Sequence, residues 1–395
     1  MALSLSRLLR PFALILGLGL AAGCAALPRL PAVPAAETHS ATFLGLTDAR
    51  FHLWGDAAPL GAMWAAAQRR HLALGRGSGN EDMLAISGGG DNGAFGAGIL
   101  YGWTQTGRRP EFRLVTGVST GALTAPFAFL GSRYDEQLKA VYTTVQRNDI
   151  AELLSVGTIL FNGDSVASSA PLARLIATYV TPQMVDEIAT EYRKGRVLLI
   201  GTTDLDLGQP VAWNIGAIAA SGHPYRVQAV RDILLASASI PGAFPPVMMD
   251  VMVDGQRRQE LHVDGGATKQ VFLYPSNVPR RALPAELRAG RGVAWVIRNG
   301  RTAEPPSQTT RGLIQITARS ISTMIASNGV GDIYRIYLVT RRDGVPFRLA
   351  YISDRFTVPY DKPFDPVYMN ALFEFGRNEI RQGHAWVDRP PGYAP

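Results

Sequence analysis

One serine in this chain has the flanking residues that covalent chemistry requires. Ser119 stands between Gly117 and Gly121 in a Gly-x-Ser-x-Gly motif, directly after an apolar run from Phe112 to Val118. Glycines two residues before and after a serine fit the sharp strand-to-helix turn called a nucleophile elbow, because that corner leaves no room for side chains. We predict that Ser119 is a nucleophile, although the same glycines could simply let a strand pack closely against a helix.

A glycine-rich loop precedes this motif by one strand and one helix. The apolar run Met83 to Ser87 leads into Gly88-Gly89-Gly90-Asp91-Asn92-Gly93 and then into a predicted helix over 94–103. Outward-facing glycine amides and the positive end of the helix dipole could hold a phosphate or an oxyanion. No Lys-Ser/Thr of a P-loop follows Gly93, which weakens a nucleotide-binding interpretation. An oxyanion hole fits better, because Ser119 lies one βα unit later at the same end of a parallel sheet.

These motifs, in this order, resemble the patatin-like phospholipases. Gly88-Gly89-Gly90-x-x-Gly93 is similar to the oxyanion loop of the family, Gly117-x-Ser119-x-Gly121 to its elbow, and Asp264-Gly265-Gly266 to the motif of its catalytic acid. The stretch from Ala236 to Val247 is similar to a segment of many bacterial members. The resemblance covers roughly residues 83–275 and implies a three-layer α/β/α fold with a central, mostly parallel sheet.

The resemblance also implies a Ser-Asp dyad that cleaves carboxylic esters of lipids, as a phospholipase A or lysophospholipase does, without a cofactor or metal. Ser119 would attack, Asp264 would act as general base and then as general acid, and the amides of Gly88, Gly89 and Gly90 would hold the oxyanion. An ordinary carboxylate is a poor base at neutral pH, so Asp264 must be partly dehydrated and hydrogen-bonded to Ser119. The remaining motif glycines would support these turns: Gly93, Gly117, Gly121, Gly265 and Gly266.

One position departs from the family pattern. The family usually places Arg or Lys where Asn92 stands in this chain. A cation there could support the glycine loop or attract an anionic head group, so loop geometry and head-group preference stay open.

Other functions compete with this hypothesis. A Ser-His-Asp esterase would need a histidine after the acid, and only His384 follows Asp264 in the chain. His262 precedes Asp264 by two residues on a predicted strand and could polarise it, although a packed histidine is the simpler interpretation. A lipoprotein that binds lipid or a partner without catalysis is a further alternative, and a serine protease rests on the elbow alone. The acidic residues Asp204 and Asp206 indicate a turn rather than a cation site.

The N-terminus has the pattern of a secretory leader. Arg7 and Arg10 precede an apolar segment that is too short to span a bilayer comfortably and ends at Cys24. Ala21-Ala22-Gly23-Cys24 resembles a bacterial lipobox, and Cys24 is the only cysteine. We predict a signal peptide over 1–23, a lipidated Cys24, and an extended Pro/Ala tether over 24–41 that holds the body away from the membrane. The protein would then lie in the bacterial cell envelope, on the outer membrane facing the periplasm.

Composition supports a folded protein that meets lipid. The 395 residues are 47% apolar and 18% charged, with a formal net charge of +7, which is typical of a globular chain. The basic residues are scattered, without the dense runs or interleaved aromatic residues of a nucleic-acid surface, so an anionic membrane or lipid is the more natural partner. The sequence does not indicate an oligomeric state.

Hydrophobic periodicity and glycine or proline residues predict the remaining elements. We expect a helical lead-in over 42–82, a catalytic core over 83–278, and a C-terminal extension of the same body over 279–395. The segment 156–169 could be a mobile cover or an ordinary surface connection. Strands are predicted over 196–203, 261–264, 292–299 and 335–340, and helices over 59–72, 134–146, 148–154, 171–180, 183–193, 311–327 and 366–386.

Overall fold

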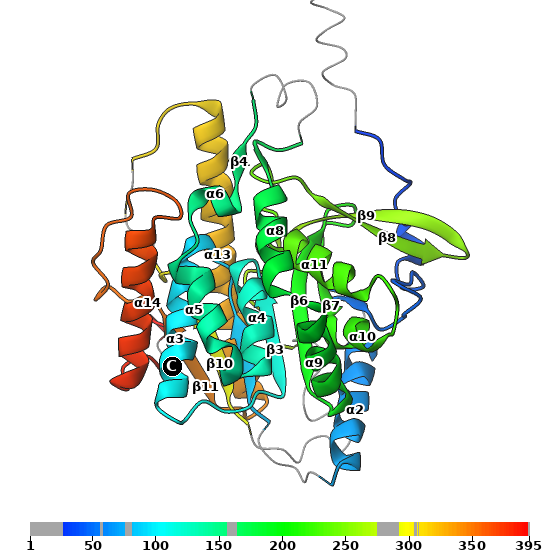
Figure 1. Cartoon of the computed structure of the whole chain (residues 1–395), viewed down its shortest axis with the longest axis horizontal. Helices are drawn as coiled ribbons and strands as arrows, with labels where there is room; N and C mark the ends of the chain where they lie inside the picture. Colours follow the sequence, from blue (N-terminus) through cyan, green and yellow to red (C-terminus); the bar gives the residue numbers. More distant parts are fainter. Residues whose placement is uncertain are drawn as a thin grey trace, which may run out of the picture.

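The computed structural model describes residues 27–55, 58–75, 81–155, 164–274, 292–303, 306 and 308–393 (Figure 1). The predicted signal peptide over 1–23 and Cys24 lie outside the described residues, as do 156–163 of the segment that could cover the site. No helix in the described ranges is long and apolar enough to cross a membrane.

A nine-stranded sheet forms the centre of the fold. Its main path runs β1-β7-β6-β3-β2-β10-β11, and the β8–β9 pair joins it through β6. The strands from β6 to β11 along this path are parallel, whereas β1, β7 and β9 pair antiparallel. The strands are β1 (Arg50–His52), β2 (Met83–Ile86), β3 (Leu114–Val118), β6 (Val197–Asp204), β7 (Gln209–Asn214), β8 (Val247–Val253), β9 (Gln256–Asp264), β10 (Ala294–Arg298) and β11 (Phe347–Tyr351).

Helices cover both faces of the sheet. Successive strand residues point to opposite faces, so each strand contributes side chains to two cores. Leu84 and Ile86 of β2 belong to one core, whereas Ala85 between them belongs to a second. The first core contains helices α3 (Gly93–Gln105), α4 (Thr120–Leu130), α5 (Asp135–Thr143), α8 (Ala170–Tyr179), α9 (Pro182–Arg193), α10 (Ile215–Ala220), α11 (Arg226–Ser237) and α14 (Pro366–Arg381). The second contains α2 (Ala58–Ala73) and α13 (Leu313–Arg342). The chain therefore has the predicted three-layer α/β/α fold with a mostly parallel sheet.

Strand register brings the two predicted catalytic segments together. Val118, the last residue of β3, pairs with Gly201 of β6. The next residue of β6, Thr202, pairs with Asp264 at the end of β9. The end of β3 and the end of β9 are therefore neighbours across one strand.

Two predicted elements are wrong. Residues 335–340 form part of helix α13 rather than a strand, because Ile333, Ile336 and Tyr337 recur at helical spacing and pack against the sheet. Residues 148–154 are not one helix: α6 (Arg147–Ile150) ends early, and β4 (Glu152–Leu153) then pairs with β5 (Ala167–Ser168). The lead-in over 42–82 is also not purely helical, since it supplies the edge strand β1.

The described part of the predicted tether lies on the body. Arg29 binds the carboxylate of Asp206, with an Nη2–Oδ2 distance of 2.6 Å. Leu30 donates its amide to Oε1 of Gln259 at 2.9 Å, the Gln259 amide donates to the Pro31 carbonyl at 3.1 Å, and Val33 is buried. From residue 29 onward this segment therefore does not act as a spacer, because it packs beside β9.

Candidate active site

Ser119 lies at the corner between β3 and α4. Its backbone has φ 55° and ψ −126°, a conformation that residues with a Cβ rarely adopt and that is often found at functional sites. A Cβ at Gly117 would lie 2.4 Å from the Gly121 carbonyl oxygen, and one at Gly121 would lie 2.3 Å from that of Ile86. Both glycines are therefore required by close backbone approach, as expected of a nucleophile elbow.

Ser237 holds the elbow from the neighbouring helix end. The Ser119 amide donates to Ser237 Oγ at 2.9 Å, and the Ser237 hydroxyl donates to the Gly201 carbonyl at 2.6 Å. Ser237 is completely buried. This side chain therefore ties the corner of β3 to β6.

Asp264 ends β9 beside the elbow and is 2% exposed. Ser119 lies close enough to the Asp264 carboxyl to influence its pKa, and Oδ1 of Asp264 accepts the Gly266 amide at 2.7 Å. Burial raises the pKa of the Asp264 carboxyl from 3.8 to about 6, and the hydrogen bonds from Ser119 and Gly266 limit that rise. A Cβ at Gly265 would lie 2.6 Å from the Gly201 carbonyl oxygen, so glycine is needed where β9 turns. The carboxylate thus has the dehydration and the contact with serine that a general base requires.

The first glycine of the triple-glycine loop touches Ser119, but its amide already donates a hydrogen bond. A Cβ at Gly88 would lie 2.9 Å from the Ser119 Cβ and 2.1 Å from Oε1 of Gln270. The Gly88 amide donates to the Gln270 carbonyl at 3.1 Å. The prediction that Gly88 is an oxyanion donor is therefore corrected: this glycine permits close approach, because its N–H already has an acceptor.

The next two glycines have amides that remain available. Gly89 and Gly90 have φ values of 153° and 59°, and a Cβ at Gly89 would lie 1.9 Å from the Asn299 carbonyl oxygen. Their amides donate to no acceptor within the described part of the chain. Gly93 then begins α3, where a Cβ would lie 2.2 Å from Thr120 Oγ1. The loop therefore carries two amides with no acceptor among the described residues, directly after the glycine that contacts Ser119 and before the start of a helix.

Four residues that sequence reasoning did not assign support this arrangement. Ser237 and Ser239 lie in the ASASIPGAFPPV stretch, and the Ser239 carbonyl accepts the Asp264 amide at 2.8 Å. Asn299 follows β10 and holds the glycine loop: it donates its amide to Ser87 Oγ at 2.8 Å and its side chain to the Ser87 carbonyl at 2.9 Å. The fourth is Gln270, whose buried Oε1 has no hydrogen-bond partner among the described residues and lies beside Gly88. Only the first pair stood in a stretch that the sequence had already singled out.

Asn92 has a structural partner in place of the family cation. Its Oδ1 accepts the Tyr368 hydroxyl at 2.8 Å, which links the glycine loop to α14. The neighbouring Asp91 is buried and accepts the Phe364 amide at 2.8 Å. The C-terminal extension therefore braces the loop directly.

Histidines do not join the dyad within the described residues. His384 lies beyond the end of α14, is exposed, and has its Nδ1 3.3 Å from the Arg355 guanidinium. His262 is buried, with Nδ1 2.9 Å from Thr202 Oγ1 and Nε2 3.3 Å from Glu260. Within the part of the chain that the structure describes, the Asp264 carboxylate interacts with Ser119 and the Gly266 amide rather than with a histidine. The geometry therefore does not assemble a Ser-His-Asp triad.

A buried polar cluster lies beside β9. Asp204, Glu260 and His262 have potential ligand atoms within 4.8 Å of one another, the one such group among the described residues. Arg50 occupies this cluster, since its guanidinium lies 2.7 Å from Glu260 Oε1. Asp204 Oδ1 accepts the Asp206 amide at 2.9 Å, which is the turn predicted there. The arginine supplies positive charge where a bound cation would otherwise be needed.

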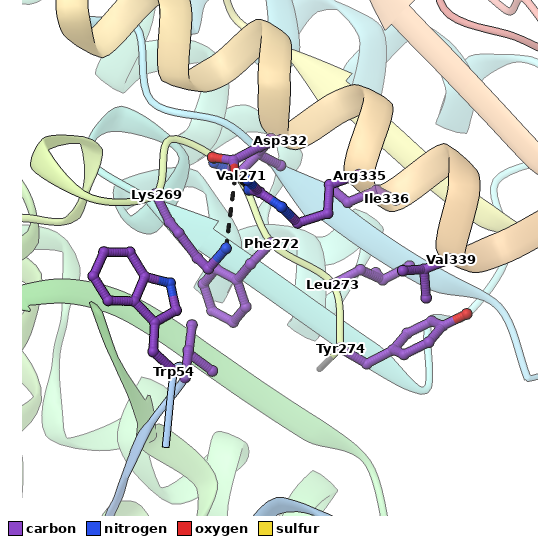
Figure 2. A pocket seen from close by; sticks show the side chains of 11 residues that line it. Trp54, Lys269, Val271, Phe272, Leu273, Tyr274, Asp332, Arg335, Ile336 and Val339 are labelled. Atoms are coloured by element: carbon purple, nitrogen blue, oxygen red, sulfur yellow. Dashed lines mark hydrogen bonds and ion pairs between the residues drawn. The ribbon is translucent and has the colours of Figure 1, made fainter. Parts of the chain in front are cut away.

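A cavity of about 250 Å³ is lined by residues 271–274 and by one side of α13 (Figure 2). Trp54 and Phe272 line it together with Lys269, whose Nζ lies 3.7 Å from Asp332 Oδ1. Its lining does not include Ser119 or Asp264. We therefore do not assign it to the reaction.

Three comparisons with known proteins were made, and the match to a family profile bears on these motifs. The solved structure of VipD from Legionella pneumophila is similar at 12% sequence identity and a TM-score of 0.41, covering 78% of this chain and 68% of that one, which is too weak to argue from. No curated protein matches the chain. The patatin-like phospholipase profile matches residues 84–283, which is half of the chain and spans the glycine loop, the elbow and Asp264. The chain therefore belongs to the patatin-like phospholipases, a family of lipid acyl hydrolases.

Proposed function

We propose that this protein is a serine acyl hydrolase that cleaves carboxylic esters of lipids through a Ser119–Asp264 dyad. The observation that carries the proposal is a buried carboxyl close enough to Ser119 for hydrogen bonding to lower its pKa, together with two glycine amides that have no acceptor among the described residues. A serine hydroxyl is a weak nucleophile until a base accepts its proton. The raised pKa of Asp264 brings its proton affinity closer to that task.

The reaction proceeds in two halves. Ser119 Oγ attacks the ester carbonyl carbon while Asp264 takes the hydroxyl proton, and the Gly89 and Gly90 amides donate to the developing oxyanion. In related sites one such donor contributes about 3 to 4 kcal/mol to the barrier reduction. The C–O bond to the alcohol breaks and Asp264 returns the proton to that alcohol, which leaves an acyl-serine. Water, activated by the same carboxylate, then releases the fatty acid.

Membership of the family supports a lipid ester as substrate, and an assay with defined phospholipids distinguishes between the possible lipids. We propose phospholipase A or lysophospholipase specificity. Purified protein is incubated with phosphatidylglycerol, phosphatidylethanolamine and their lysophospholipids, and fatty acid release is measured by mass spectrometry. We expect release by the wild type and none by Ser119→Ala, with both proteins equally folded by circular dichroism. Equal release by the two proteins would exclude Ser119 as the nucleophile.

The non-catalytic alternative makes the opposite prediction in the same assay. A lipoprotein that only binds lipid or a partner would retain phospholipid without releasing fatty acid, and Ser119→Ala would leave its binding unchanged. The intact serine, carboxylate and unpaired amides support the enzyme instead. A soluble p-nitrophenyl acyl ester serves as a second substrate, because its turnover does not depend on lipid packing.

We further propose that Cys24 carries a diacylglyceryl group that anchors the protein to the outer membrane, facing the periplasm. The support is in the sequence, where an apolar segment ends at the only cysteine of the chain. The test is metabolic labelling with an alkyne fatty acid in a bacterial host. We expect the label in the wild type and its loss in Cys24→Ser; a label that persists in Cys24→Ser would place the modification elsewhere.

A further inference from the structure

The first half of α13 is a helix with little protein around it. Figure 1 shows its first turns, in yellow, rising beyond the sheet. Leu313 is 83% exposed, Ile316 48% and Met324 58%. These residues stand at positions i, i+3 and i+11, so they share one face of the helix. Most helical stability in proteins comes from packing of an apolar face, so this face lacks the cover that such helices usually have.

The same helix reaches the catalytic centre with its next turn. A Cβ at Gly266 would lie 3.2 Å from the Ile325 Cγ2, and Asn328 donates its side-chain amide to the Ala267 carbonyl at 3.4 Å. Gly266 in turn donates to the Asp264 carboxylate. Twelve residues at about 1.5 Å per residue put Leu313 about 18 Å from this contact along the helix. The exposed face therefore begins beside the dyad and leads away from the body.

The charged residues at the start of α13 and just before it are all basic. No acidic residue occurs between Glu304 and Asp332, whereas Arg311 and Arg319 are both exposed. Thr317 and Ser320 lie on the same face, so the face is uncharged and only partly apolar. Large exposed apolar side chains flanked by arginines and free of carboxylates suit a helix that lies in the interface of an anionic bilayer. Two copies of the chain packed along this face would instead bring four arginines together without a carboxylate from the same segment to neutralise them.

We propose that residues 311–324 form an interfacial docking surface that inserts Leu313, Ile316 and Met324 into an anionic phospholipid bilayer. The surface holds the dyad at the membrane, where a lipid ester can leave the bilayer and reach Ser119. This inference rests on the proposed lipid substrate for its purpose. The binding itself requires no turnover and is measured separately.

The single cysteine of the chain permits a local test in the full-length protein. In a Cys24→Ser, Ser119→Ala background, Met324→Cys or Leu74→Cys carries a polarity-sensitive fluorophore. Leu74 is the matched control, because it is 53% exposed and lies just after α2. Vesicles of phosphatidylglycerol and phosphatidylethanolamine are then added, with phosphatidylcholine vesicles as the uncharged comparison. Because the probe reports its own surroundings, an anchor elsewhere in the chain does not produce the signal.

We expect a blue shift on the anionic vesicles for the Met324→Cys probe and none for the Leu74→Cys probe. Arg319→Gln should weaken binding to anionic vesicles about fivefold and change binding to phosphatidylcholine little. No shift at position 324, or equal shifts at both positions, would overturn the proposal. A shift that appears without vesicles and grows with protein concentration would also overturn it, because it would assign the face to a second copy.

Activity gives a second and independent readout. We expect Leu313→Ser/Ile316→Ser to lower hydrolysis of anionic vesicles about tenfold or more, because burial of two large apolar side chains is lost. Hydrolysis of a soluble p-nitrophenyl ester should be unchanged. Unchanged hydrolysis of vesicles by this variant would contradict the docking surface but leave the dyad intact. Failure of the wild type on both substrates, with the fluorescence shift present, would contradict the proposed function and leave the docking surface intact.

Discussion

Replacement of Asp264 by asparagine should abolish turnover and stabilise the fold at neutral pH. The carboxyl is 2% exposed, and burial raises its pKa from 3.8 to about 6. At ~1.4 kcal/mol per pKa unit, keeping this group ionised in the folded state costs about 3 kcal/mol. Asparagine has the same shape, can still accept the Gly266 amide and carries no charge. The variant therefore loses the base but also loses the energetic penalty of a buried carboxylate.

The sign of the effect depends on pH. Below about pH 4 the carboxyl is protonated in both the folded and the unfolded state, so wild type and Asp264→Asn should be similar in stability. Because the folded pKa is the higher one, stability of the wild type falls as pH rises from about 4 to about 6 and is level above that range. The free energy of unfolding is measured by urea titration at pH 4 and pH 7. We expect an advantage of up to about 3 kcal/mol for Asp264→Asn at pH 7 and little at pH 4.

Activity and a matched variant complete this test. Turnover of a p-nitrophenyl ester should fall at least about a thousandfold in Asp264→Asn, as expected when a general base is removed. Ser119→Ala is the control: it also loses activity, but its stability should fall with pH at least as much as that of the wild type, because without Ser119 the pKa of Asp264 rises further. An Asp264→Asn variant whose stability difference from wild type is the same at pH 4 and pH 7 would refute the idea of a dehydrated carboxylate.

Three further predictions concern the same centre. The value of kcat/KM should rise with pH through about 6 as Asp264 loses its proton, and a pH-independent profile between pH 5 and 8 would contradict its role as base. Ser237→Ala removes the contacts with the Ser119 amide and the Gly201 carbonyl, so we expect a loss of about 1 to 3 kcal/mol in unfolding free energy and a lower kcat at similar KM. His384→Ala should leave esterase activity nearly unchanged, because His384 contacts Arg355 rather than the dyad; a large loss would restore the triad hypothesis.

The sequence could predict the parts of the site that depend on local geometry. Gly117 and Gly121 are needed because a Cβ at either position would lie within 2.4 Å of a backbone oxygen, and such a requirement is visible as a motif. The end of β9 at Asp264 could be predicted because glycine is also required at position 265, where a Cβ would lie 2.6 Å from the Gly201 carbonyl oxygen. The occupied amide of Gly88 could not be predicted, because its acceptor belongs to Gln270, far along the chain. Support from Asn299 was missed for the same reason, since it follows a strand about 180 residues after the elbow.

The secondary structure shows a similar division. Strands β2 and β3 and the last four residues of β9 were predicted correctly, because short apolar runs ended at glycines. The run Tyr-Arg-Ile-Tyr-Leu-Val-Thr near residue 337 has strong strand preference but is helical, since α13 buries one side of it against the sheet. Packing across the fold therefore overrode local preference in the one long helix of the second layer.

The contact between Arg29 and Asp206 limits the reach of any membrane anchor on Cys24. Arg29 follows Cys24 by five positions, and an extended chain spans at most about 3.5 Å per residue. A lipid on Cys24 would thus be joined to the folded body by a linker no longer than about 18 Å. Such a linker would permit the body to change its orientation on the bilayer surface, but not to reach lipids of a facing membrane.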